Sequence, residues 1–333
     1  MRAIVFDSYG SPDVLELREI DMPTVGDNDV LVRVRAASIN ALDWHYMTGL
    51  PYVMRLMTGL RTPKCKRLGA DLAGTVEQLG RNVTQFRLGD EVFGQVDGEV
   101  PGKPELELGS FGEYVRVSEE CVVSKPHGLS FEQAAAVPVA GVTAMQMLRD
   151  VGQVKQGQRV LINGASGGVG TFAVQIAKSL GAEVTGVCST GNIEIARSIG
   201  ADRVIDYSKE DFAASAERVD VMLDNVGNRT LSDCRRVLKP HAVYISSFGR
   251  PDRRWIGPML QLAQMSLQSK FSDQRLISKV AKRSKGDLLA LTELIEAKRV
   301  TPIIDRTYTL SEITEAMRYF ELGHAQGKVV INV

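Results

Sequence analysis

A glycine-rich turn between a short apolar run and a helical pattern constrains this chain more than any other stretch. The apolar run is 160–162, and the turn at 164–170 reads Gly-Ala-Ser-Gly-Gly-Val-Gly. Apolar residues at spacings of three and four then predict a helix that ends at Gly181, and 184–187 predicts the next strand. A strand, a glycine turn, a helix and a second strand form the opening unit of a dinucleotide-binding fold. In such a unit a pyrophosphate faces the free amides of the helix start.

The turn departs from the common fingerprint at one position. Ala165 stands where the first glycine of the motif is usual, so the motif alone is only moderately specific. The alternative is a glycine turn that merely packs a helix on a strand. The strand before the turn and the helix after it favour dinucleotide binding.

The composition is that of an ordinary globular protein. Of 333 residues, enough for two domains, 44% are hydrophobic and 24% charged. Lys and Arg together number 40, as do Asp and Glu, so we expect no nucleic-acid partner. The cysteines are scattered, which predicts no disulfide framework and no metal knuckle. The strand-like run 3–6 leaves no room for a signal peptide, and the apolar stretch 134–148 is too short for a bilayer. We expect a cytoplasmic protein without a membrane span.

Two patterns divide the chain into an α/β protein of two domains. Residues 1–124 contain short strand and turn units, which indicate a compact, irregular β-barrel. Residues 125–283 alternate strands with helices and predict a parallel sheet with helices on both faces. Residues 284–333 add helices and a closing strand.

Four local features carry further expectations. Residues 51–63 are Met-rich without a clear period, which predicts a loop. Ser130 has the spacing of a capping box, and Ser311 is expected to cap a later helix. The basic stretch 251–285 is either a helix docked on its own core or a surface for a membrane or a nucleic acid, and docking is favoured.

Motifs along the chain carry a resemblance to a known family. Those of the first domain are Ala-Ser-Ile-Asn-Ala-Leu-Asp at 37–43, Gly-Ala-Asp-Leu-Ala-Gly at 69–74 and Gly-Asp-Glu-Val-Phe-Gly at 89–94; the others lie at 165–170, 198–202, 204–207, 224–227 and 327–330. With them the chain resembles the zinc-independent medium-chain dehydrogenases/reductases of the quinone oxidoreductase (zeta-crystallin-like) branch over nearly its whole length. Residues 164–175 are most similar to the reticulon-interacting mitochondrial oxidoreductases of that branch.

The resemblance implies the domain architecture. Residues 1–124 with 284–333 would form a GroES-like catalytic domain, and 125–283 a Rossmann domain with a doubly wound parallel sheet. The active site would lie in the cleft between them. We also expect a homodimer.

The resemblance implies no metal. The zinc enzymes of the sister branch have Cys near Asn40 and a His-Glu pair where this chain has Ala70 and Asp71. A catalytic zinc site needs three protein ligands. His45, Cys65 and Asp71 are poorly placed to supply them.

NADPH is the expected cofactor. An NAD enzyme presents an acid about 20 residues past the glycines, whereas this chain has hydroxyls and a glycine there. By resemblance, Ser189 and Tyr207 bind the 2′-phosphate, but the Lys that follows the serine in many relatives is absent. Glu194 lies nearby instead, and Arg197 or Arg203 could compensate. The alternative for Tyr207 is an aromatic ring packed under a loop.

The resemblance places further residues on the cofactor. The pyrophosphate would lie on Ser166, Gly167, Gly168 and Val169, and the nicotinamide with its ribose near Asn225, Phe248 and Lys328. The alternatives are turn chemistry at strand ends for Asn225 and Phe248, and a solvated strand-edge charge for Lys328.

The implied reaction is hydride transfer to the β-carbon of a quinone or an α,β-unsaturated carbonyl. Hydrogen-bond donors are then needed at the carbonyl oxygen. Asn40 offers an amide, and Asp43 could orient it. The proton could come from solvent, His45 or Tyr46, and the alternative for these two is a half-buried loop pair. The side chains expected to wall an apolar substrate pocket are Trp44, Met47, Tyr52, Met54 and Met57.

Two other functions stay open. One is a non-catalytic NADPH-binding protein with a structural or regulatory role. The other is a zinc-free alcohol dehydrogenase, for which no general base is evident.

Overall fold

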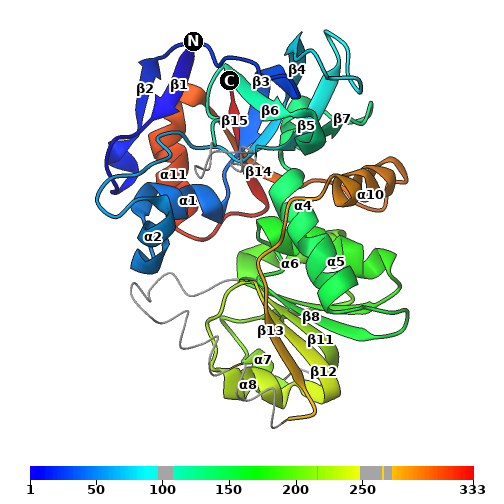
Figure 1. Ribbon diagram of the computed structural model, residues 1–333. Coiled ribbons are helices and arrows are strands. Elements are labelled where there is room, and N and C mark those ends of the chain that lie inside the picture. Colours follow the sequence, from blue (N-terminus) through cyan, green and yellow to red (C-terminus); the bar gives the residue numbers. More distant parts are fainter. Residues whose placement is uncertain (97–107, 216, 248–264, 266–271) are drawn as a thin grey trace. The chain divides into compact units, whose positions relative to one another are not determined.

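The structure is a computed structural model that describes residues 1–96, 108–215, 217–247, 265 and 272–333 (Figure 1). The chain divides into two compact units. Met1–Ala140, Arg283–Glu296 and Pro302–Val333 form the first, and Gly141–Lys282 with Ala297–Thr301 forms the second. Residues 125–140, which the sequence pattern assigns to the start of the second domain, therefore pack within the first unit.

The second unit is built on a six-stranded sheet in which every paired strand is parallel to its neighbour. The strand order is β10-β9-β8-β11-β12-β13. The bounds are β8 Arg159–Asn163, β9 Glu183–Cys188, β10 Arg203–Asp206, β11 Val219–Asp224, β12 Leu238–Ser246 and β13 Arg275–Ser278. The central strands β8 and β11 are mostly buried and carry apolar runs, 160–162 and 221–223, because both faces of a parallel sheet are covered. The predicted parallel sheet is confirmed.

Helices lie on both sides of this sheet (Figure 1). Figure 1 shows α5 and α6 on one side, and α7 and α8 on the other. The α7 residue Phe212 and the α8 residue Cys234 share a buried cluster with the strand residues Leu161 and Met222. The helices are α4 Pro138–Met145, followed by a π-helical turn at Gln146–Val151, then α5 Gly168–Ser179, α6 Ile193–Ser198, α7 Phe212–Ser215 and α8 Leu231–Arg236.

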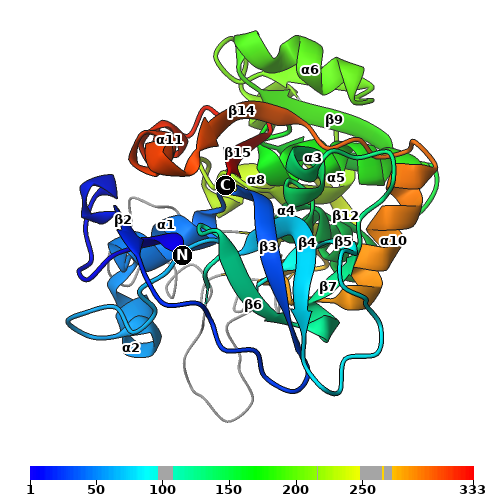
Figure 2. The ribbon, with the colours of Figure 1, turned by 90° about the horizontal axis from the view of Figure 1, so that it is seen from above.

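The first unit is built on a mainly antiparallel seven-stranded sheet with the path β14-β15-β3-β4-β5-β7, and β6 also pairs with β3. A separate two-stranded ribbon joins β1 and β2. Figure 2 shows the long strand β3 running between β6 and β4. The bounds are β1 Arg2–Val5, β2 Glu16–Glu19, β3 Asp29–Ser38, β4 Asp71–Leu79, β5 Glu91–Gln95, β6 Tyr114–Ser118, β7 Val122–Ser124, β14 Ile304–Thr309 and β15 Lys328–Asn332.

The helices of the first unit correct two expectations. Residues 51–63 are not a plain loop, because they hold a 3-10 turn at Tyr52–Met54 and the short helix α2. Ser311 does not cap the later helix: a capping box of Thr309 and Glu312 begins the 3-10 turn Leu310–Glu312, which leads directly into that helix. The bounds are α1 Ala41–Thr48, α2 Arg55–Thr58, α3 Phe131–Ala135, α10 Lys285–Glu296 and α11 Ile313–Glu321, with further 3-10 turns at Pro12–Val14, Glu119–Cys121 and Leu310–Glu312; the second unit has one at Thr190–Asn192.

The capping box at Ser130 is confirmed. Its hydroxyl accepts from the Gln133 amide at 3.2 Å, and the Gln133 side chain accepts from the Ser130 amide at 3.1 Å. Reciprocal bonds of this kind satisfy two of the amides that a helix start leaves free.

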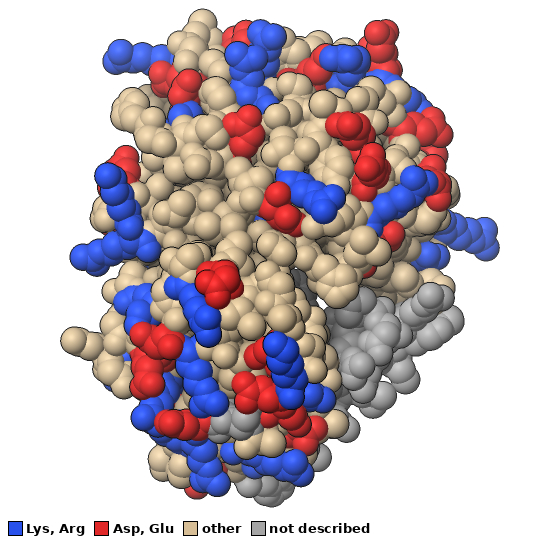
Figure 3. Space-filling model, turned by 180° about the vertical axis from the view of Figure 1, so that it is seen from behind, with Lys and Arg blue, Asp and Glu red and all other residues tan. Residues whose placement is uncertain are grey.

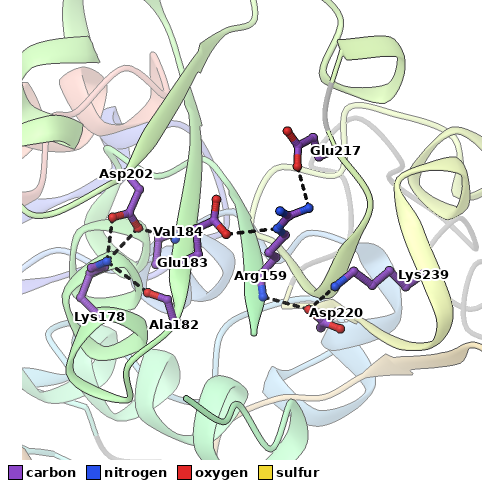
Figure 4. A network of polar contacts seen from close by, with 9 residues as sticks. All are labelled: Arg159, Lys178, Ala182, Glu183, Val184, Asp202, Glu217, Asp220 and Lys239. Carbon is purple, nitrogen blue, oxygen red and sulfur yellow. Dashed lines mark hydrogen bonds and ion pairs between the residues drawn. The ribbon is translucent and has the colours of Figure 1, made fainter. Parts of the chain in front are cut away.

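Ion pairs join the amino ends of the parallel strands (Figure 4). Arg159 at the start of β8 lies 2.6 Å from Glu217 and 3.1 Å from Glu183, and its amide donates to Asp220. Lys239 also reaches Asp220, at 2.8 Å. These side chains are well exposed, so each pair contributes about 1 kcal/mol or less. The opposite edge holds the carboxyl ends of the strands, which is the edge that binds ligands in open α/β sheets.

The visible surface carries both signs of charge. On the face drawn in Figure 3, basic and acidic side chains are interspersed, and neither sign covers a large area by itself. Among the helices of the described residues, none is long and apolar enough to cross a membrane. The basic stretch 251–285 falls mostly outside the described residues, and its described end holds the strand β13 rather than the expected helix.

Candidate cofactor site and active site

The glycine turn joins the end of β8 to the start of α5, and two of its glycines differ in what surrounds them. A Cβ at Gly170 would lie 2.0 Å from the Gly164 carbonyl oxygen, so Gly170 lets the helix pack closely on the turn. Gly167 has an ordinary φ of −80°, and a Cβ there would meet only the Gly164 oxygen, at 3.6 Å. The space beside Gly167 is therefore open. Packing within the described chain does not require a glycine at this position.

The start of α5 presents donors on this open side. The helix begins after Gly167 with no side-chain cap, so its first amides have no partner within the helix. Ser166 is buried, and its hydroxyl oxygen accepts from the Asn192 side-chain Nδ2 at 2.8 Å. The hydroxyl hydrogen is therefore left to donate. Such an array of donors at a helix start suits an anion. The predicted residues Ser166 to Val169 lie together here.

A buried carboxylate fixes the next turn along the carboxyl edge. Asp224 accepts from Asn163 and from the Tyr244 hydroxyl, both at 2.9 Å. It also accepts from the amides of Val226 and Gly227. Burial, with the Asp224 charge adding to it, raises the pKa of Tyr244, so its hydroxyl keeps the proton that it donates. The ends of β8, β11 and β12 are therefore held together by one side chain, whose role the motif alone did not reveal.

Asn225 directly follows Asp224, and the nitrogen of its side-chain amide is an unused donor among the described residues. Its side-chain oxygen accepts from the Ser247 hydroxyl at 2.7 Å. Its Nδ2 is buried and makes no hydrogen bond to any described residue. A buried donor without a partner is rare in folded proteins and indicates a ligand or an ordered water. Phe248, the other residue expected near the nicotinamide, lies outside the described residues.

The paired strands β9 and β10 bring the two predicted phosphate-binding hydroxyls, those of Ser189 and Tyr207, to one edge of the sheet. Tyr207 follows β10, and its amide donates to the carbonyl of Cys188 at the end of β9, one residue before Ser189. The Tyr207 side chain is 41% exposed, so it is not a ring packed under a loop. Neither hydroxyl is hydrogen-bonded to another described residue. Glu194, expected nearby, is paired with Arg197 at 3.0 Å.

In the first unit, a buried polar cluster lies where β3, β4 and β15 meet. Lys328 is only 3% exposed, and its ammonium lies 2.5 Å from the Asn40 Oδ1, 3.0 Å from the Ile39 carbonyl and 3.3 Å from Asp71. Three acceptors engage the three hydrogens that an ammonium can donate. Lys328 is therefore not the solvated strand-edge charge of the alternative reading. A contact with a cofactor would require one of these bonds to break, and this role stays a prediction.

Asn40 is held by the same cluster. Its Nδ2 donates to Asp71 at 2.9 Å and to the Ser38 carbonyl at 3.2 Å, while its oxygen accepts from Lys328. Both amide hydrogens are thus engaged. Donation to a substrate carbonyl, as expected from the sequence, would require Asn40 to give up one of them.

Asp43 caps helix α1 rather than orienting the Asn40 side chain. One carboxylate oxygen accepts from the Asn40 backbone amide and the other from the Gly69 amide, each at 2.8 Å. Complete burial raises the pKa of Asp43 to about 7. The Asp71 charge raises this pKa further, whereas the two backbone donors and the Lys328 charge oppose the shift.

His45 and Tyr46 are neighbours on α1 but differ in their surroundings. The His45 Nδ1 lies 2.6 Å from the Leu50 carbonyl, which can only accept, so Nδ1 carries the hydrogen and Nε2 is free to accept. Nε2 makes no hydrogen bond to any described residue. Burial lowers the pKa of His45, which keeps the ring neutral at pH 7. Tyr46 is buried at 5% exposure among core residues of the unit.

The side chains expected to wall a substrate pocket are not alike. Met47 is fully buried in the hydrophobic core, and Met54 and Trp44 pack against that core. Met57 is 73% exposed. The Tyr52 ring is covered by the Arg55 guanidinium, 4.8 Å from its centroid.

Comparison with known proteins identifies the family. Two family models match the chain, an alcohol dehydrogenase GroES-like domain over residues 26–127 and a zinc-binding dehydrogenase over residues 199–331. The mitochondrial NAD(P)H oxidoreductase RTN4IP1 of Mus musculus is 35% identical over 363 residues, which cover 100% of this chain and 89% of the relative. The chain belongs to the medium-chain dehydrogenase/reductase family. The GroES-like and Rossmann folds expected from the resemblance are thereby confirmed.

Other members of the medium-chain family cover the whole chain as well. The chloroplastic NADPH-dependent alkenal/one oxidoreductase of Arabidopsis thaliana is 31% identical over 340 residues, covering 99% of this chain and 79% of the relative. The solved structure of the quinone oxidoreductase from Coxiella burnetii superposes with a TM-score of 0.85 at 32% identity, covering 100% of this chain and 99% of the other.

The zinc that some members of the family use does not fit the described residues around Asp71. The described residues contain no group of three His, Cys, Asp or Glu side chains that could hold a metal ion. At the position of the zinc ligands of the sister branch, Asp71 accepts from Ser38, Asn40 and the Lys328 ammonium. A cation already lies beside the carboxylate, and the other groups are an amide and a hydroxyl rather than thiolates or imidazoles.

Proposed function

We propose that this chain is an NADPH-dependent reductase of quinones or α,β-unsaturated carbonyls and that it works without zinc. Its family and the names of its relatives support the coarser description, an NAD(P)H-dependent oxidoreductase. The observation that carries the proposal is the Asn225 side-chain amide, whose Nδ2 has no partner among the described residues, at the same sheet edge as the open glycine turn. Both features are unexplained by packing and are expected where a dinucleotide binds.

The chain's residues would divide the cofactor between them. The amides that start α5 and the Ser166 hydroxyl would hold the pyrophosphate, as an anion on a helix start. Ser189 and Tyr207 offer free hydroxyls to the adenosine ribose and its phosphate. The Asn225 Nδ2 would donate to the nicotinamide end. When bound, the cofactor supplies the hydride, and these residues orient it and exclude water.

His45 is the most suitable of the four predicted catalytic residues for moving a proton. Asn40 and Asp43 use their polar atoms within the fold, and Tyr46 is buried. The neutral His45 ring has an accepting Nε2 and is held by the Leu50 carbonyl. It can take up a proton from water at Nε2 and return it to the reduced product, whose oxygen or α-carbon requires one.

A matched pair of glycine variants tests the cofactor site. Gly167→Val places a side chain in the open space beside the helix start, so it should fold normally and lose most NADPH affinity in calorimetry. Gly128→Val is the control, because a Cβ at Gly128 meets nothing within 4 Å and lies on a turn of the first unit, outside the second unit that holds the proposed site. Unchanged NADPH affinity in Gly167→Val, in protein that melts like wild type, would refute the pyrophosphate site.

The reaction is tested separately with wild-type protein. NADPH consumption is followed with a panel of quinones, enones and aldehydes, and NADP⁺ reduction with alcohols, in the presence and absence of a chelator. We expect turnover with quinones or enones that the chelator leaves unchanged. NADPH binding without turnover of any acceptor would favour the structural or regulatory role, and alcohol oxidation would favour the dehydrogenase.

A further inference from the structure

A carboxylate that the sequence pattern did not single out lies beside the proposed phosphate-binding hydroxyls. Asp206 ends β10, and it pairs with Cys188 at the end of β9. It is 6% exposed. Its oxygens accept from the Thr190 hydroxyl at 2.6 Å and from the Ser208 hydroxyl, also at 2.6 Å, as well as from the Ser208 amide. The Ser208 and Thr190 bonds hold the pKa of Asp206 at about 2, so the group is ionised at neutral pH.

These bonds decide what the two hydroxyls can offer a ligand. Each hydroxyl has one hydrogen, and short bonds to an ionised carboxylate are the favoured use of it. Thr190 and Ser208, whose oxygens lie 3.0 Å apart, therefore present lone pairs and not donors. An ionised Asp206, with two hydroxyl oxygens in front of it that can only accept, attracts ribose hydroxyls and repels a phosphate. Without a cation, this edge would favour NADH.

Lys209 supplies such a cation. Its ammonium lies 3.5 Å from the Asp206 carboxylate, and its side chain is 67% exposed. Asp206 already accepts three hydrogen bonds from Thr190 and Ser208, so its bond to Lys209 is long and weak. Lys209 is thus kept near the edge by charge while remaining able to turn towards another anion at little cost.

The two arginines expected to compensate do not supply this cation: Arg203 begins β10, at the amino edge of the sheet, and Arg197 is engaged elsewhere. Arg197 pairs with Glu194 on the exposed side of α6. The lysine that many relatives carry shortly after the serine is absent here, and the structure brings a lysine from the neighbouring strand end instead.

We propose that Lys209 is the residue that lets this chain accept the 2′-phosphate of NADPH. Asp206 positions the Lys209 ammonium, and its negative charge would repel a 2′-phosphate that no cation neutralises. The proposal rests on the proposed function, since it concerns the adenosine end of the same cofactor. Lys209 is a specificity residue: it would contact the phosphate and leave the reaction itself unchanged.

The test uses cofactor fragments, so that it does not depend on turnover. Calorimetry compares 2′,5′-ADP with 5′-AMP on the full chain, wild type and Lys209→Gln, at low and high salt. In wild type we expect tighter binding of 2′,5′-ADP, with an advantage that shrinks as salt rises. Lys209→Gln should lose about tenfold of that advantage, as expected for one charged hydrogen bond, and bind 5′-AMP as before.

Controls separate the possible outcomes. Lys239→Gln removes a lysine that also pairs with an aspartate, but at the opposite, amino edge of the same sheet, and should change neither affinity (Figure 4). The kcat/KM ratio for NADPH over NADH should fall in parallel in Lys209→Gln. If wild type favours 2′,5′-ADP and Lys209→Gln keeps the full advantage, the Lys209 proposal is overturned while the proposed function stands. If wild type shows no preference for 2′,5′-ADP, the NADPH assignment and the Lys209 proposal both fail.

Discussion

Replacing Lys328 with methionine should destabilise the protein more than any loss of a surface ion pair. The substitution keeps the aliphatic chain but removes an ammonium that is 3% exposed and bonded to Asp71, Asn40 and a backbone carbonyl. Asp71 would then be a fully buried carboxylate that retains Ser38, Asn40 and the Val139 amide but no cation. The loss acts on three elements at once, because β3, β4 and β15 meet at this cluster.

The magnitude follows from the environment of the pair. Removing one partner of a buried ion pair typically costs about 3–5 kcal/mol, because a charge is left uncompensated. The Ile39 carbonyl and the Asn40 oxygen also lose a donor, at roughly 1–3 kcal/mol each, although terms within one network do not add. Better burial of the methionine end offsets part of this. We expect a net loss of about 4 kcal/mol in the free energy of unfolding.

Urea unfolding followed by circular dichroism measures this loss. Lys66→Met is the matched control, because Lys66 forms an ion pair of 2.9 Å with Asp7 at a side-chain exposure of 59%. It should change stability by less than about 1 kcal/mol. Adding Asp71→Asn to Lys328→Met should recover part of the loss, since no buried charge then remains unpaired.

A Lys328→Met variant that keeps its stability would contradict this prediction. If Lys328→Met is as stable as Lys66→Met, the ammonium does not hold the cluster together. If that stable variant has in addition lost NADPH affinity, Lys328 contacts the cofactor, as the family resemblance implied, and its bonds to Asn40 and Asp71 are broken on binding.

Two further predictions follow from the same structure. Asp43 has a pKa of about 7 in the folded chain against an ordinary value of 3.8, so the folded state holds this proton more tightly than the unfolded state does. The free energy of unfolding should therefore fall by roughly 4 kcal/mol as pH rises from about 4 to about 7. Asp43→Asn should remove this pH dependence of the free energy of unfolding, measured by urea unfolding, and expose the opposite trend of His45, whose lowered pKa makes stability decrease as pH falls below 6.5. An unchanged pH dependence would show that the Asp43 pKa is not raised by folding. Gly170→Ala should lower stability by several kcal/mol in the same assay, because its Cβ would lie 2.0 Å from a backbone oxygen, and a variant as stable as wild type would contradict the packing argument.

Local patterns were enough to predict the first five strands of the second unit but not β13, which lies in the stretch 251–285 expected to be a helix. The parallel strands appear as apolar runs, and the glycine turn is marked by Gly164, which adopts a φ of +83°. The capping error at the later helix was also local: Thr309 has Glu312 three residues on, which is the capping-box spacing, whereas Ser311 has no acid or amide there. That signal was present and could have been found.

The polar clusters could not be found in this way, because their members are far apart in the sequence. Lys328 and Asp71 are separated by 257 positions and meet only because β15 and β4 both pair with β3. Asp206 and Thr190 meet because β10 lies beside β9. A carboxylate at the end of a buried strand is a weak signal, and its partners depend on the strand order, which no local pattern encodes.

The same strand order separates residues that stabilise the fold from those left to bind. Asp71, Asp206 and Asp224 each end or begin a strand and accept from side chains of a neighbouring strand or turn. Their oxygens accept hydrogen bonds within the chain, so these carboxylates mainly fix the edges, and Asp206 acts on a ligand through its charge. Among the described groups that remain available at the carboxyl edge of the parallel sheet are the Asn225 amide, which has no described partner, and Lys209, which is only loosely held. These two groups can form new bonds without breaking strong ones, which is why variants at the satisfied carboxylates should alter stability first, and variants at Asn225 and Lys209 cofactor affinity first.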